Sequence, residues 1–155
     1  MKSPIMCLFI VLMLVIPACA LFESTSLDQY IARYNSSMDK APMFLKSAIG
    51  SEKVELDIAM NNGSQFKVGM ETNNALVIRT VKGGIEDPTI HIQTREEVMQ
   101  TISQASDPIT AFQQAKEAGN ITITGNNVLS NLKVNAALSS MDVLKFFYGV
   151  LFGHG

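Results

Sequence analysis

The longest uninterrupted apolar stretch of the chain lies at its amino terminus. Residues 5–16 are all apolar, and no charged residue stands between Lys2 and Glu23. One basic residue, an apolar run of this length and then Pro17 with small residues are typical of a secretory signal. Residues 1–22 are therefore expected to form a leader, and residues 23–155 an exported domain.

The end of this leader allows three interpretations. Ala18-Cys19-Ala20 fits the small-x-small pattern for cleavage after Ala20. Residues 16–19 resemble a lipoprotein box with Cys19 as the lipidated residue, which we favour because it explains a cysteine there, although Pro17 departs from the box. Residues 5–22 are also just long enough for an uncleaved anchor. All three place the domain outside the cytoplasm, anchored at the cell envelope or secreted.

Both cysteines, Cys7 and Cys19, lie in the leader, so the exported domain has no disulfide and no cysteine-based metal site or nucleophile. Its core must then be held by apolar burial alone. Asn-x-Ser/Thr sequons at Asn35, Asn62 and Asn120 permit glycosylation where the host has the machinery.

After the leader, the apolar positions first follow a helical period. The sequence 26–29 fits a capping box. It precedes a stripe at i, i+3, i+4 and i+7 that predicts a helix packed on the core: Leu27, Tyr30, Ile31 and Tyr34. A second short helix is expected from Pro42 to Gly50.

From Lys53 the period changes to two, which predicts strands. Val54, Leu56, Ile58 and Met60 share one face, and the turn signal 61–64 leads into a second strand. Further alternation over 75–81 and at 90–92 predicts two more strands, separated by breaks at 83–84 and 87–88. Four strands in succession with short turns predict an antiparallel meander with one apolar and one wet face.

The rest of the chain alternates between helix and strand signals. Residues 94–97 fit a second capping box, and Asp107-Pro108 opens a helix that Gly119 ends. Ile121 and Ile123 predict a fifth strand. The spacing of Leu129, Leu132 and Ala136 suggests a helix after Gly125, and a very apolar helix is expected over 141–152.

Two of these motifs resemble the sterol carrier protein type 2 (SCP2) domain family. They are Asp107-Pro108-Ile109-Thr110-Ala111-Phe112, followed by a lysine, and Ile121-Thr122-Ile123-Thr124-Gly125-Asn126; the strand 89–94 is also similar. The resemblance covers about residues 43–147, with a small insertion after Lys116. It implies an α+β fold in which helices cover a five-stranded, mainly antiparallel sheet. It also implies an apolar tunnel for fatty acyl chains or sterols, and it brings no catalytic residue and no cofactor.

Composition and charge exclude several other functions. There are 12 basic and 14 acidic residues, a net charge of −2, and no basic run, so nucleic acid is not an expected partner. His91 lies on the wet face of a predicted strand, and His154 is nearly terminal. No histidine pair has metal spacing, and neither a Gly-x-Ser-x-Gly elbow nor a phosphate loop is present. Glu96-Glu97 is expected to be a solvated helix start. An enzyme is therefore not predicted.

The leading hypothesis is a non-enzymatic carrier of an apolar lipid, either fatty acyl or sterol- and isoprenoid-like. Ligand sites of this kind are mostly apolar with few polar anchors. The candidate cavity lining consists of Ile109, Phe112, Leu129, Leu132, Met141, Leu144 and Phe147. The alternative is a surface interaction or structural module of the same fold, with the cavity filled by its own side chains.

Overall fold

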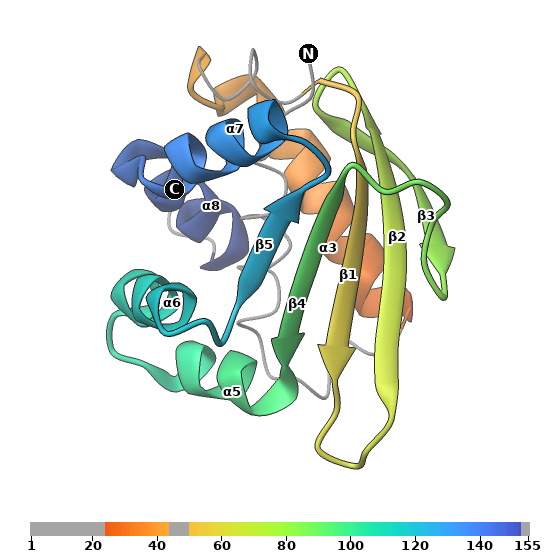
Figure 1. Cartoon of the computed structure of the whole chain (residues 1–155). Helices are drawn as coiled ribbons and strands as arrows, with labels where there is room; N and C mark the ends of the chain where they lie inside the picture. Colours follow the sequence, from red (N-terminus) through yellow and green to blue (C-terminus); the bar gives the residue numbers. More distant parts are fainter. Residues whose placement is uncertain (1–23, 44–49, 153–155) are drawn as a thin grey trace.

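The computed structural model describes residues 24–43 and 50–152 (Figure 1). The predicted leader, most of the predicted helix after Pro42, and His154 lie outside the described residues. The elements in chain order are α3 (Ser24–Ser37), η1 (Met38–Lys40), β1 (Lys53–Ala59), β2 (Gln65–Asn73), β3 (Leu76–Lys82), β4 (Ile90–Arg95), α5 (Glu96–Gln104), α6 (Pro108–Glu117), β5 (Thr122–Gly125), α7 (Val128–Leu138) and α8 (Met141–Phe152). No helix in this part of the chain has both the length and the hydropathy needed to cross a membrane.

The strands form one five-stranded sheet in the order β3-β2-β1-β4-β5. β4 runs parallel to β1, and the other neighbouring pairs are antiparallel. The expected meander is therefore wrong at the fourth strand, which lies beside β1 instead of β3. The reason is that alternation specifies which face a side chain takes but not which strand lies alongside, and the segment 83–89 is long enough to carry the chain across the sheet.

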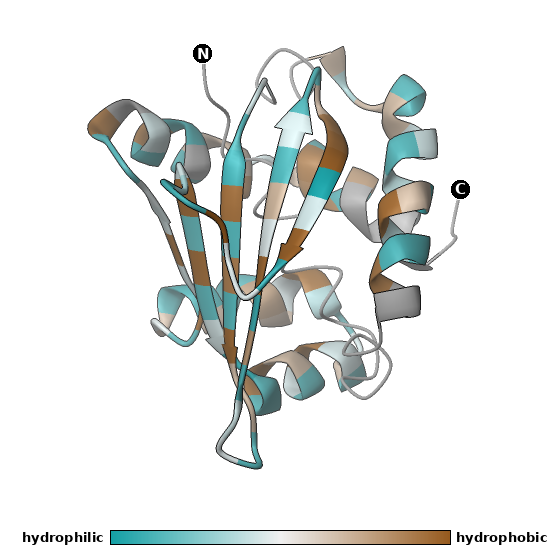
Figure 2. Ribbon diagram, turned by 90° about the vertical axis from the view of Figure 1, so that its right-hand side faces the viewer, coloured by the Kyte–Doolittle hydropathy of each residue, from teal (hydrophilic) through white to brown (hydrophobic). Residues whose placement is uncertain are grey.

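The predicted faces of the sheet are confirmed. In the register of β1 with β4, Val54 pairs with Ile90 and Leu56 with Ile92, and all four side chains are buried. Figure 2 shows the resulting alternation of apolar and polar residues along the strands. Helix α3 crosses behind β1 and β2 in Figure 1 and contacts α8. The hydrophobic core therefore lies on this buried face of the sheet.

Helix α3 attaches to the free edge of the sheet through two adjacent residues. Tyr34 is fully buried, as its place in the apolar stripe predicts, and its hydroxyl donates to the carbonyl of Ala75 at 2.7 Å. The side chain of Asn35 donates to the carbonyl of Val77 at 2.9 Å and accepts from its N–H at 3.0 Å. Asn35 therefore takes the place of a neighbouring strand at this point of β3.

Neither predicted capping box forms. Helix α3 is already under way at Ser24, so Ser26 is not its N-cap. The N-cap of α5 is Arg95, and no side chain caps this helix. The two side chains of the predicted box have other partners: the hydroxyl of Thr94 donates to the carbonyl of Asn120, and the carboxylate of Glu97 forms an ion pair with Arg95.

The predicted boundaries of α6 are confirmed. Asp107 accepts from the N–H of Thr110 at 3.1 Å, and Pro108 is the first helical residue. Gly119 follows the helix with a φ of +74°, a left-handed conformation that favours glycine. The cap of α7 is Asn127, which accepts from the N–H of Ser130.

The loop between β3 and β4 lies against the polar face of the sheet and covers Glu55. This carboxylate is buried, its Oε1 is 2.9 Å from the ammonium of Lys67, and its Oε2 accepts from the N–H of Ile85. Gly69 allows this approach, because a Cβ there would collide with the side chain of Ile85. Burial acts to raise the pKa of Glu55, but the hydrogen bonds from Lys67 and Ile85 and the charges of Lys67 and His91 outweigh it, so the pKa is lowered.

The lowered pKa predicts acid sensitivity of the fold. A carboxyl whose pKa is lower in the folded state stabilises above its unfolded pKa of about 4.5, and this stabilisation is lost as the pH falls through the folded value. We expect Glu55→Gln to lower the free energy of unfolding at pH 7 by about 1–3 kcal/mol, and to flatten its dependence on pH in the acid range. Urea unfolding followed by circular dichroism measures both, with Glu86→Gln on the same loop as the charge-matched control. Parallel pH profiles for wild type and Glu55→Gln would contradict this role.

The contact between Asn35 and Val77 predicts that Asn35 protects the sheet edge. Asn35→Ala leaves the N–H and carbonyl of Val77 without this partner, so we expect a loss of about 1–3 kcal/mol in the free energy of unfolding. Because a free strand edge pairs readily with another strand, self-association should also rise with protein concentration, as measured by light scattering after size exclusion. The neighbouring variant Ser36→Ala should behave as wild type.

Candidate functional site

An apolar hollow of about 310 Å³ lies between helices α5 and α6; we call it the α5–α6 hollow. Helix α5 contributes residues at i, i+3 and i+4, and α6 with its C-cap contributes residues at i, i+3, i+4 and i+7, so one face of each helix lines it. The lining residues are Val98, Thr101, Ile102, Ala111, Gln114, Ala115, Ala118 and Asn120.

The hollow exists because its α6 side is built from small side chains. Ala111, Ala115 and Ala118 fill little of the space between the two helices, whereas Val98 and Ile102 are buried and belong to the core. An apolar group entering the hollow therefore meets the outer surface of the core directly. Larger side chains at the alanine positions would occupy the same volume.

The polar groups of the hollow are uncharged. The hydroxyl of Thr101 donates to the carbonyl of Glu97 at 2.9 Å, and the side-chain oxygen of Asn120 accepts from Arg95 at 3.0 Å. Arg95 itself forms an ion pair of 2.8 Å with Glu97. None of the residues that line the hollow is a nucleophile with a neighbouring base.

The seven residues that the sequence suggested as cavity lining are not gathered around this hollow. Phe112 and Leu144 are fully buried, and Ile109 packs partly buried against the core. Leu132 and Met141 lie at the surface with 62% and 46% of their area exposed. The side chains of Leu129 and Phe147 lie outside what the structure describes.

The helix predicted from Leu129, Leu132 and Ala136 is present as α7. Leu132 and Ala136 are exposed, and among the side chains that the structure describes on this helix the buried apolar ones are Ala137 and Leu138. The α5–α6 hollow itself was not predicted, because large apolar side chains were expected to line the cavity. The alanines at 111, 115 and 118, on one helix face beside Phe112, were the available signal.

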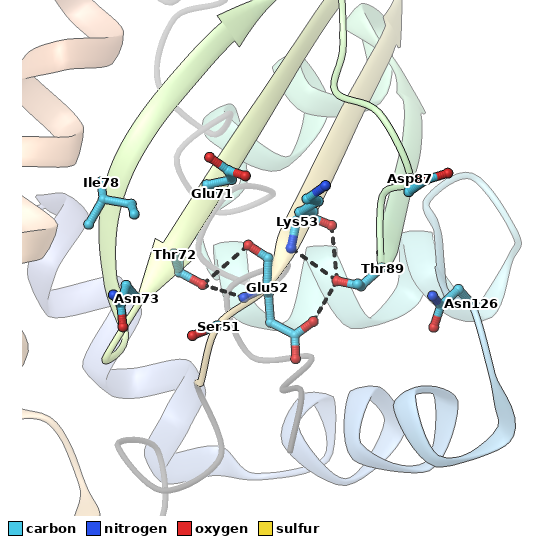
Figure 3. Close-up of a pocket in the computed structure, with 10 residues that line it drawn as sticks. All are labelled: Ser51, Glu52, Lys53, Glu71, Thr72, Asn73, Ile78, Asp87, Thr89 and Asn126. Atoms are coloured by element: carbon cyan, nitrogen blue, oxygen red, sulfur yellow. Dashed lines mark hydrogen bonds between the residues drawn. The ribbon is translucent and has the colours of Figure 1, made fainter.

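A second, polar pocket of about 430 Å³ lies at the end of the sheet (Figure 3). Figure 3 shows Thr72 and Thr89 on either side of Glu52, and all three residues are buried. Thr89 donates to the Glu52 carboxylate at 2.5 Å and accepts from the N–H of Lys53 at 3.0 Å, and Thr72 accepts from the N–H of Glu52 at 2.9 Å. This network joins β1 to both of its neighbouring strands, so it supports the sheet.

In the described part of the chain, the titratable side chains that the sequence singled out are His91, Glu96 and Glu97. His91 lies half exposed on the polar face, where the sequence placed it, with Nδ1 3.5 Å from Glu55. Glu96 and Glu97 both lie in the first turn of α5, and Glu97 is well exposed. Within residues 24–43 and 50–152, no three histidine, cysteine, aspartate or glutamate side chains come together in a way that could hold a metal ion.

Comparison with known proteins relates the fold to solved structures. No family model and no curated protein matches the chain. The protein TT1886 from Thermus thermophilus, described as a possible sterol carrier protein, is 13% identical with a TM-score of 0.54, and the match covers 84% of this chain and 89% of that one. The UbiJ-SCP2 ubiquinone synthesis protein is 11% identical with a TM-score of 0.51, over 81% and 95% of the two chains. The chain therefore has the SCP2-like α+β fold that the sequence predicted.

Proposed function

We propose that this protein binds and carries an apolar lipid, fatty acyl or sterol- and isoprenoid-like, without converting it. The observation that carries the proposal is an apolar hollow, lined without any charged residue, between two helices of an SCP2-like fold. Small-molecule sites are concave and mostly apolar, with a few polar groups that fix orientation. One structural neighbour is itself described as a possible sterol carrier protein.

The energy for binding comes from removing hydrocarbon from water. Burial contributes about 0.8 kcal/mol per methylene, so five buried methylenes contribute about 4 kcal/mol before the ordering of the ligand is subtracted. The buried side chains of Val98 and Ile102 form the surface against which such a chain would lie. No covalent step is needed, and we propose no enzymatic activity.

We further propose that three residues of the candidate lining, Ile109, Phe112 and Leu144, form the inner part of the same site. Ile109 and Phe112 are on α6, the helix that walls the hollow, and α6 contacts α8, which carries Leu144. Because Phe112 and Leu144 are fully buried, a ligand reaching them must displace α6 or α8 slightly. The other candidates, Leu129, Leu132, Met141 and Phe147, are on α7 and α8, and the exposed side chains of Leu132 and Met141 are not part of this inner region.

A second candidate function is that of a surface interaction module with a self-filled interior. Full burial of Phe112 and Leu144 favours it, as does the exposure of Val128 and Leu132, which lie one turn apart on α7. The lipid-binding experiment below decides between the two candidates.

We propose that the domain acts outside the cytoplasm and is held at the cell envelope. The support is the sequence of residues 1–22, in which an apolar run precedes Cys19. A lipid carrier in such a place would exchange its cargo with the adjacent membrane.

The lipid-carrier proposal predicts cargo in the isolated protein. The full chain, purified as the cell processes it, should show lipid adducts by native mass spectrometry, and after lipid removal it should bind a fluorescent fatty acid. Ala115→Phe fills the α5–α6 hollow, so affinity should fall at least about tenfold. Ala136→Phe, at an exposed position of α7, is the matched control and should bind as wild type. An empty wild-type protein that also fails to bind the probe would favour the interaction module.

The leader predicts a specific covalent state. The intact mass of membrane-extracted protein should correspond to a chain that begins at Cys19 and carries acyl groups, and Cys19→Ser should shift the protein from the membrane to the soluble fraction. An unmodified chain that begins at residue 21 would contradict lipidation and indicate simple secretion. A chain that retains residues 1–22 would indicate an uncleaved anchor. Glycans on Asn35, Asn62 or Asn120 would appear in the same spectrum.

A further inference from the structure

The residues that line the α5–α6 hollow indicate which kind of head group its ligand would have. Five of its eight lining residues are apolar, and the other three, Thr101, Gln114 and Asn120, are polar but uncharged. Among the residues that the structure describes, no lysine, arginine or histidine lines it. The site therefore provides hydrogen-bonding groups without a counter-charge.

Such a lining compensates poorly for the desolvation of an ionised carboxylate. Moving a carboxylate out of water costs several kcal/mol unless a cation or several donors compensate. Arg95, which bonds Asn120 at the rim, already forms its ion pair with Glu97 at 2.8 Å. A fatty acid bound here would compete with an existing carboxylate for this cation, whereas an uncharged head group would not.

Gln114 is suited to a hydroxyl or amide head group. Its side chain is exposed at the hollow and makes no hydrogen bond within the described part of the chain. A primary amide has both donors and an acceptor, and it therefore complements a hydroxyl, which also donates and accepts. Thr101 differs, because its hydroxyl is committed to the carbonyl of Glu97.

The size of the hollow restricts the apolar part of the ligand. Its volume of about 310 Å³ lies at the lower end of the range of roughly 300–1,000 Å³ typical of small-molecule sites. A space of this size between two helices suits one flexible hydrocarbon chain better than a rigid system of four fused rings.

We infer that the α5–α6 hollow selects single-chain lipids with an uncharged hydroxyl or amide head group over ionised fatty acids, with Gln114 as the head-group partner. The inference rests on the proposed lipid-binding function and adds the class of ligand. Placing a cation at Gln114 should then reverse the preference.

The test compares 1-dodecanol with dodecanoate at pH 8, where the acid is ionised and the chains are equal in length. Purified full chain, stripped of copurified lipid, is titrated with each ligand against a fluorescent acyl probe. Wild type should bind the alcohol at least about tenfold more tightly than the acid. Gln114→Lys should raise the affinity for the acid about tenfold, whereas Gln113→Lys, on the same helix but not in the lining, should leave the ratio unchanged.

The outcomes separate this inference from the proposed function. If wild type binds dodecanoate as tightly as dodecanol, or if Gln113→Lys changes the ratio as much as Gln114→Lys does, the head-group inference is overturned and the carrier function stands. Tighter binding of cholesterol than of dodecanol would overturn the single-chain part. If no lipid binds, the proposed function falls, and the inference falls with it.

Discussion

The parallel pairing of β1 with β4 is the constraint on which the rest of the structure depends. It places Ile90 and Ile92 beside Val54 and Leu56 in the middle of the sheet, where all four are buried. It also requires the chain to cross the polar face after β3, and that crossing loop covers Glu55. Since α5 follows β4 without a break and β5 returns alongside β4, helices α5 and α6 are brought together at this side of the sheet, and the hollow between them follows from the same pairing.

The sequence predicted local structure well and strand neighbours poorly. The two-residue period, the turn at 61–64 and the Asp107-Pro108 start of α6 depend on adjacent residues, and the structure confirms them. The order of the strands depends on contacts between distant segments, which leave no periodic signal. The capping box at 94–97 fails for a related reason, because the hydroxyl of Thr94 bonds the carbonyl of Asn120, far along the chain, and this bond replaces the local one.

For the candidate site, the sequence indicated helix α6, but the residues it named are not the ones that line the α5–α6 hollow. Large apolar residues were chosen as lining, and Phe112 is indeed on α6, yet it points into the core while the alanines of the same helix face the hollow. Apolar character alone does not distinguish a side chain that fills the core from one that lines a cavity. Leu132 illustrates the further limit that an apolar residue on a helix need not be buried, because the packing partners of α7 decide which face is covered.

A hollow of this kind links stability to ligand occupancy. The two cysteines lie within residues 1–22, so the domain depends on packing and hydrogen bonds without a disulfide. Ala111, Ala115 and Ala118 fill little of the space between α5 and α6, and each contact that is not made there forgoes dispersion energy. A hydrocarbon chain in that space restores these contacts, and a ligand that binds only the folded state stabilises it in proportion to the logarithm of its concentration over its dissociation constant. On the proposed function, the small alanines of α6 leave space that a bound hydrocarbon chain would fill, and the ligand would then supply the packing that larger side chains would otherwise have provided.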